Sequence, residues 1–158
     1  LPSEILDFRE VLVQNRIIVL DSISDPGNMG TIIRTADWFG VTTIYISKNC
    51  VDVFNPKVVQ ATMGSLSRVK IHQIEIGDFL IQLKNKNILC YGACLEGQSV
   101  YEVDKINPCA LVFGSESHGI SNDVKKILDN NILIPSNNKT IDSLNVSVAF
   151  GIILSEFR

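Results

Sequence analysis

An arginine one helical turn beyond a glycine is the first arrangement in the sequence that could do chemistry. Residues 25–30 (DPGNMG) open an expected helix over 29–39, in which Arg34 would lie over Gly30 because helical side chains lean toward the N-terminus. We expect space beside the guanidinium for a ribose or phosphate, since a guanidinium and a helix N-terminus both favour anions. The alternative is structural: Asn28 only caps the helix, and Arg34 forms a solvated pair with Asp37.

A glycine-bounded turn with one carboxylate follows an apolar run later in the chain. Residues 111–120 read LVFGSESHGI, in which Gly114 and Gly119 allow the backbone to come close to a ligand. Glu116 could orient Arg34 or hold a hydroxyl, or it could accept hydrogen bonds from the amides of its own turn. Histidine is a frequent general acid or base, but a lone histidine in a turn carries little positional information, and we do not favour His118 for that role.

A polar loop after Ile134 leads into a last helix, expected to begin near Ser143 and to run toward the end of the chain. Asp142 or Ser143 can cap this helix. From Leu144 onward its residues are apolar almost all round, and such a helix must be buried. We therefore expect a homodimer that covers this helix or its neighbour, with burial inside one chain as the alternative.

Apolar runs that alternate with helical segments must position these three loops. The expected helices, besides those at 29–39 and after Ser143, begin at Pro56 after Asn55 and cover 122–128 after Ser121. The expected strands cover 16–20, 41–47, 68–73, 88–93, 110–113 and 132–134. This order predicts a single α/β domain with a parallel sheet of about six strands flanked by helices. Ligands bind at the carboxyl ends of such strands, where the three loops lie.

Composition sets limits on what this domain could do. The chain has 158 residues and 17.5 kDa, with 46% hydrophobic and 20% charged residues, which fits one folded domain and excludes a second large one. Fourteen basic minus seventeen acidic residues give a net charge of −3, which argues against a generally basic nucleic-acid wrapper but leaves room for a local basic site. No apolar run is long enough to span a bilayer, and we expect neither a membrane span nor a signal peptide.

The four cysteines and the glycines exclude several kinds of site. Cys90 and Cys94 lack the spacing and the nearby histidine of a zinc site, so we expect free thiols, no metal and a reducing cytoplasm. Neither a dinucleotide-binding G-x-G-x-x-G nor a phosphate-binding G-K-[ST] follows the first strand, so the sequence does not favour a nicotinamide-dependent oxidoreductase.

Taken together, residues 25–37, 111–120, 134–135 and 143–149 resemble the SpoU (TrmH) family of RNA ribose 2′-O-methyltransferases in the SPOUT superfamily, and 57–65 also resembles a family segment. The resemblance implies S-adenosylmethionine as methyl donor, a C-terminal trefoil knot, and a homodimer with its active site near the subunit interface. It makes residues 1–158 a catalytic domain, and we expect an N-terminal RNA-binding domain, which many members carry, to be absent from this chain.

The family pattern also implies roles for individual residues. The catalytic positions map to Asn28, Arg34, Glu116, Ser143 and Asn145. The donor contacts map to Gly114, Ile134 and Leu144, with Leu95 as a further candidate. Residues 136–139 (SNNK) depart from the pattern of the donor loop.

The family reaction suggests how Arg34 would act and which RNA would be modified. A guanidinium holds its proton firmly and is a poor base, so we expect Arg34 to position the target phosphate and to stabilise a developing alkoxide. Ribosomal RNA is favoured over transfer RNA, and a non-catalytic RNA-binding or ribosome-binding module of this fold is the alternative. Because of the net charge, we expect the 158 residues alone to bind the donor but to bind RNA weakly.

Overall fold

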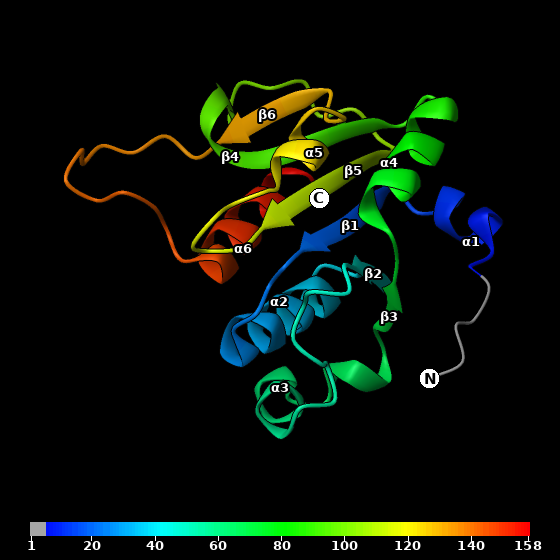
Figure 1. The fold of residues 1–158 in the computed structure, drawn as a ribbon. Helices are drawn as coiled ribbons and strands as arrows, with labels where there is room; N and C mark the ends of the chain where they lie inside the picture. The colour runs from blue at the N-terminus through cyan, green and yellow to red at the C-terminus, as the bar shows by residue number, and fades with distance from the viewer. Residues whose placement is uncertain (1–5) are drawn as a thin grey trace.

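Six parallel strands in the order β3-β2-β1-β5-β4-β6 form the centre of the computed structural model, which describes residues 6–158 (Figure 1). The predicted six-stranded parallel sheet is confirmed. The strands are β1 (Arg16–Asp21), β2 (Thr43–Ile46), β3 (Lys70–Gln73), β4 (Leu89–Ser99), β5 (Cys109–Gly114) and β6 (Asn130–Leu133). The largest difference is in β4, which continues past the expected end at 93 because a bulge between Ala93 and Gln98 lets it keep pairing with β6.

Helices cover both faces of this sheet. They are α1 (Phe8–Leu12), α2 (Pro26–Trp38), α3 (Pro56–Thr62), α4 (Ile76–Asn85), α5 (Asn122–Lys125) and α6 (Val146–Glu156), with a short 3-10 helix, η1 (Ser65–Ser67). The buried side chains of α2, α3 and α6 join the core on one face, and those of α1, α4 and α5 join the core on the other. The sequence prediction named neither α1 nor α4.

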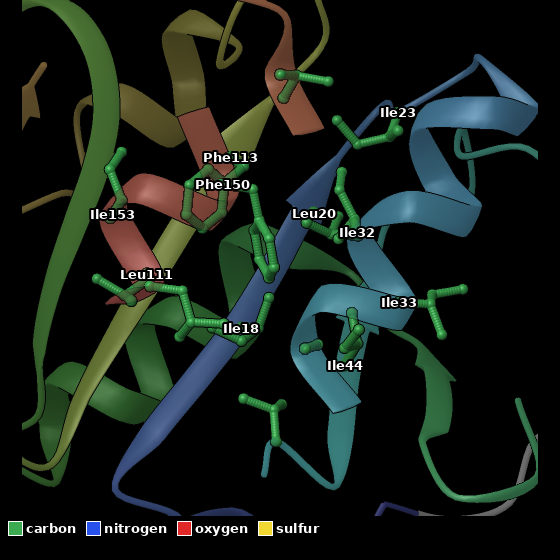
Figure 2. Packing of buried hydrophobic residues seen from close by; sticks show 14 of the residues in the cluster. Ile18, Leu20, Ile23, Ile32, Ile33, Ile44, Leu111, Phe113, Phe150 and Ile153 are labelled. Carbon is green, nitrogen blue, oxygen red and sulfur yellow. The ribbon is translucent and has the colours of Figure 1, made fainter. Parts of the chain in front are cut away.

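The alternation of side chains along β1 divides the core into two layers. Ile18 and Leu20 point toward α2 and α6, whereas Ile17 and Val19 point toward the opposite face. Figure 2 shows the first layer, in which the ring of Phe150 from α6 packs on the sheet. Its centroid lies 4.9 Å from that of Phe113 in an edge-on arrangement. Because β1 and β5 are neighbours, this layer fixes α6 and α2 above the two central strands.

The ends of three helices differ from the expected ones. α2 begins at Pro26, because the Asp25 side chain accepts a hydrogen bond from the Asn28 backbone N–H at 2.8 Å and is therefore the cap. The interpretation of Asn28 as the cap is wrong. α6 begins at Val146 with Asn145 as its cap, rather than near Ser143. α5 ends at 125 rather than 128.

The remaining helix starts follow the sequence more closely. Asn55 caps α3 as predicted, accepting from the Lys57 N–H at 2.9 Å. Ser121 stands at the N-cap of α5 but makes no capping bond with its side chain.

The four cysteines are free thiols, as expected. Cys90 and Cys109 lie on neighbouring strands but belong to opposite faces of the sheet, which keeps their sulfur atoms apart. Burial is the main cause that raises the pKa of each of these two thiols to about 12. Within residues 6–158, no helix is long and apolar enough to cross a bilayer, and no three His, Cys, Asp or Glu side chains are grouped to hold a metal ion.

Candidate active site

The loops that follow β1, β5 and β6 meet at the carboxyl edge of the sheet. β1 and β5 are paired in register, so that Asp21 lies beside Gly114. The backbone N–H of Ser121 donates to Asp21 Oδ2 at 3.1 Å and ties the first loop to the second. Asn145 Nδ2 donates to Asn28 Oδ1 at 3.0 Å and ties the first loop to the third. Parallel strand order alone therefore brings together three segments that lie far apart in the sequence, as predicted.

Asn145 holds two elements at once. Its Oδ1 accepts hydrogen bonds from the backbone N–H groups of Ser147 at 2.9 Å and Val148 at 3.3 Å, which caps α6. Its Nδ2 makes the bond to Asn28, which is only 8% exposed. The pair therefore joins the first turn of α2 to the first turn of α6, and the two amides are held in fixed relation to each other.

A cavity of about 940 Å³ opens between the ends of β4, β5 and β6 and the loop before α6. All four residues expected to contact a donor line it, namely Leu95, Gly114, Ile134 and Leu144. Ser143 lines it as well, and the large exposed side chains of Leu95, Ile141 and Leu144 give it an apolar rim.

Negative charge predominates on the wall of this large cavity. Its lining includes three carboxylates, Glu96, Glu116 and Asp142, against Lys125 as the one lysine or arginine among the described lining residues. This balance favours a ligand that carries positive charge.

A second pocket of about 210 Å³ adjoins the first. Its lining comes from the loop after β1, the turn after β5 and the start of α6: Ile23, Ser24, Asp25, Asn28, Glu116, Ser117 and Val146. Glu116, Ser117 and Val146 line both spaces, so the two share a wall. Such a pair of spaces can hold a large and a small reactant against each other.

Glu116 lies at the tip of a turn that is closed by its own backbone. Ser115 and Gly119 exchange N–H to O hydrogen bonds of 3.2 and 2.8 Å, and Ser115 Oγ accepts from the His118 N–H at 3.1 Å. Among the described residues the Glu116 carboxylate has no hydrogen-bond partner, so the interpretation that it bonds to the amides of its turn is wrong. The carboxylate is exposed toward both cavities instead.

Arg34 lies on the exposed face of α2 and lines neither cavity. Within residues 6–158 its guanidinium forms no hydrogen bond or ion pair. The alternative interpretation, a pair with Asp37, is wrong, because Arg68 Nη2 lies 2.7 Å from Asp37 Oδ2, which also accepts from Ser65 Oγ at 2.8 Å. The bond from Arg68 is the largest cause that lowers the pKa of Asp37 below its ordinary value, followed by the bond from Ser65.

The space expected above Gly30 is filled by α3. A Cβ at Gly30 would lie 2.3 Å from Ala61 Cβ and 3.0 Å from the Val58 carbonyl oxygen. Gly30 therefore lets α2 and α3 approach each other closely. Room here for a ribose or phosphate was instead expected from the sequence, and that expectation is wrong.

Asp21 was missed from the sequence, and for Gly114 a requirement of the loop itself was missed. Asp21 is only 7% exposed and accepts two hydrogen bonds. Its Oδ2 accepts from the Ser121 N–H, and its Oδ1 accepts from the Ser22 hydroxyl at 3.1 Å. The sequence did hold a signal for Asp21, because this carboxylate ends an otherwise apolar strand. Gly114 is required by its own loop, since a Cβ there would lie 2.1 Å from the Gly119 carbonyl carbon.

Comparison with known proteins gives a consistent picture. The family model described as SpoU rRNA Methylase matches residues 15–155. The chain is 39% identical over 142 residues to the 23S rRNA (guanosine-2′-O-)-methyltransferase RlmB of Blochmanniella floridana, covering 89% of this chain and 56% of that protein. It is 29% identical over 144 residues to the 23S rRNA guanosine 2′-O-methyltransferase RlmP of Bacillus subtilis, covering 90% and 58%.

A solved structure extends the likeness to the fold. The SpoU methyltransferase AviRb of Streptomyces viridochromogenes, in complex with AdoMet, superposes with a TM-score of 0.85 at 28% identity. The match covers 96% of this chain and 63% of that one. The chain thus spans between about half and two thirds of the length of these three relatives.

Proposed function

The chain belongs to the SpoU rRNA Methylase family, and on that premise we propose that it transfers a methyl group from S-adenosylmethionine to a ribose 2′-hydroxyl of RNA. The observation that carries the proposal is the pair of adjoining spaces. The larger has an apolar rim and an acidic wall, and the smaller is lined by Asn28 and Glu116. A donor and an acceptor of very different size would meet at their shared wall.

The larger cavity suits the donor in size and charge. Its volume of about 940 Å³ is within the range of pockets for drug-sized ligands. S-adenosylmethionine supplies an electrophilic methyl group on a positively charged sulfonium, and the carboxylates of Glu96, Glu116 and Asp142 favour that charge. The apolar side chains of Leu95 and Leu144 would cover the flat adenine ring.

We assign the smaller pocket to the target ribose. Glu116 and Asn28 would orient the nucleotide, and Ser143 would make hydrogen bonds from the wall of the larger space. Asn145 lines neither space and would hold Asn28 in place. Much of the rate enhancement would come from holding the 2′-oxygen, the methyl carbon and the sulfur in line.

Arg34 would act across a subunit interface. We propose a homodimer, because α2 and α6 pack side by side and each leaves large side chains exposed: Trp38 is 86% exposed and Val148 is 50% exposed. Only one side of α6 is buried in its own chain, although the helix is apolar almost all round. In the dimer, Arg34 would reach the partner's ribose pocket and bind the target phosphate.

Residues 1–158 would form the catalytic domain of this enzyme, with ribosomal RNA as substrate, in keeping with the relatives named above. Transfer RNA is the alternative substrate. The free thiols support a reducing, cytoplasmic location. The C-terminal trefoil knot stays a prediction.

Methyl transfer is tested by calorimetry with S-adenosylmethionine, followed by transfer of tritiated methyl groups to ribosomal RNA from cells that lack the protein. We expect donor binding and 2′-O-methylation at one site. Arg34→Ala should bind donor normally and lose turnover, whereas exchange of the remote Lys86 for alanine should change neither. Donor binding without transfer to any RNA would favour the non-catalytic binding module instead.

A further inference from the structure

We propose that Asn28 donates a hydrogen bond from Nδ2 to the ribose 2′-oxygen during methyl transfer, and that Asn145 is the positioning residue that sets the direction of the Asn28 amide. This inference rests on the proposed function and deepens it. It assigns one atom of the smaller pocket to the charge that develops on the reacting oxygen.

The orientation of the Asn145 side chain is dictated by the backbone. The first N–H groups of α6 can only donate, so the atom that caps them must be an oxygen. Oδ1 fills this place, accepting from Ser147 and Val148. The amide nitrogen of Asn145 must therefore face away from the helix, and there it lies 3.0 Å from Asn28.

The same reasoning carries over to Asn28. Asn145 Nδ2 can only donate, so the Asn28 atom that meets it must be Oδ1. The two N–H groups of Asn28 Nδ2 are then directed elsewhere, and within residues 6–158 neither is used in a hydrogen bond. Asn28 lines the smaller pocket, and its Nδ2 is not among the buried polar atoms without a partner. We place this nitrogen at the pocket. The α6 backbone thus fixes, through two amides, a donor at the ribose pocket.

Such a donor stabilises the transition state more than the ground state. As the 2′-oxygen forms its new bond to the methyl carbon, its O–H proton passes to water or to an RNA phosphate, and the sulfonium becomes a neutral thioether. Negative charge grows on the oxygen while the proton departs. A fixed donor aimed at that oxygen typically accelerates such a step by two to three orders of magnitude.

The test compares Asn145→Asp with Asn145→Ala in the whole protein. Aspartate still caps α6, but its second oxygen cannot donate, so the Asn28 amide turns over and presents Oδ1 to the pocket. We expect kcat to fall about 100-fold or more, with the donor Kd and the KM for RNA within about threefold of wild type. The melting temperature should stay the same or rise, because a carboxylate favours a helix N-terminus.

Alanine removes both the cap and the constraint on Asn28. This variant should melt at a lower temperature, yet keep a higher kcat than Asn145→Asp, because its Asn28 amide is free to adopt either direction. Asn28→Asp, which keeps an acceptor for Asn145 but loses the donor, should resemble Asn145→Asp in kcat. Asn55→Asp is the matched control, since it makes the same exchange at the cap of α3, and it should have wild-type kcat.

The outcomes separate the two levels of the argument. A wild-type protein that methylates no RNA would overturn the proposed function and this inference with it. An active wild type whose Asn145→Asp variant keeps kcat within about threefold, or is faster than Asn145→Ala, would overturn the inference alone.

Discussion

Exchange of Gly30 for alanine tests whether this glycine serves helix packing or a ligand. The added methyl carbon would lie 2.3 Å from Ala61 Cβ, whereas carbon atoms in contact ordinarily lie about 3.5–4.0 Å apart. The Val58 carbonyl oxygen and the Ala61 carbonyl carbon lie within 3.2 Å on the same side, so α3 as a whole must move back by more than an ångström.

The expected loss of stability in Gly30→Ala follows from two opposing effects. Overpacking of this kind costs about 1–3 kcal/mol, and the upper value applies here because the obstacle is a helix rather than a flexible side chain. Alanine in place of glycine stabilises a helix by about 1 kcal/mol. The net loss of about 2 kcal/mol corresponds to a melting temperature lower by about 4–8 °C in a chain of this size.

Thermal unfolding of four proteins measures this loss and identifies its cause. They are wild type, Gly30→Ala, Ala61→Gly and the double variant, in which the methyl group has changed helices. The double variant should regain most of the stability lost in Gly30→Ala, because one methyl group again occupies the contact. A Gly30→Ala protein as stable as wild type, or one not rescued by Ala61→Gly, would refute the packing interpretation and favour the space for a ligand.

Three further predictions concern the ion pair, the interface and the large cavity. Because Arg68 lowers the pKa of Asp37, the pair stabilises the fold above the ordinary carboxyl pKa and this contribution is lost as the pH falls through the lowered value. The free energy of unfolding, measured with urea, should therefore fall less for Asp37→Asn than for wild type between about pH 5 and pH 2. An equal fall in both proteins would contradict the ion pair. Val148→Lys should convert the dimer to a monomer in sedimentation at micromolar concentration, and a wild type that is already monomeric would refute the dimer. S-adenosylmethionine should slow alkylation of Cys94, which lines the cavity, but not of Cys50, which does not; equal rates for Cys94 with and without donor would place the donor elsewhere.

The sheet could be predicted from the sequence because its signal is local. Runs such as the one that forms β1 are apolar on both faces, as central parallel strands require. The first residues of the helices were harder to predict, since several neighbouring residues could serve as the N-cap. Asp25 rather than Asn28, and Asn145 rather than Ser143, became caps because of the exact course of the loops before them.

The site could be predicted only as far as it depends on strand order. That Asn28, Glu116 and Asn145 would meet follows from parallel strands whose loops share an edge. The partner of Asp37 could not be predicted, because Arg68 is distant in sequence and the nearer Arg34 offered a helical pair. The role of Gly30 was missed for the same reason: only the placement of α3 shows that Ala61 occupies the space.

The pairing of β1 with β5 also governs how the chain can fold during synthesis. Residues 16–73 can form β1, β2 and β3, but one edge of β1 has no partner until residue 114 has left the ribosome. The face of α2 that α6 covers stays open still longer. The hydrogen bond between Asn28 and Asn145 closes only after α6 has docked, so a nascent chain cannot assemble the site before residues 146–156 have been synthesised.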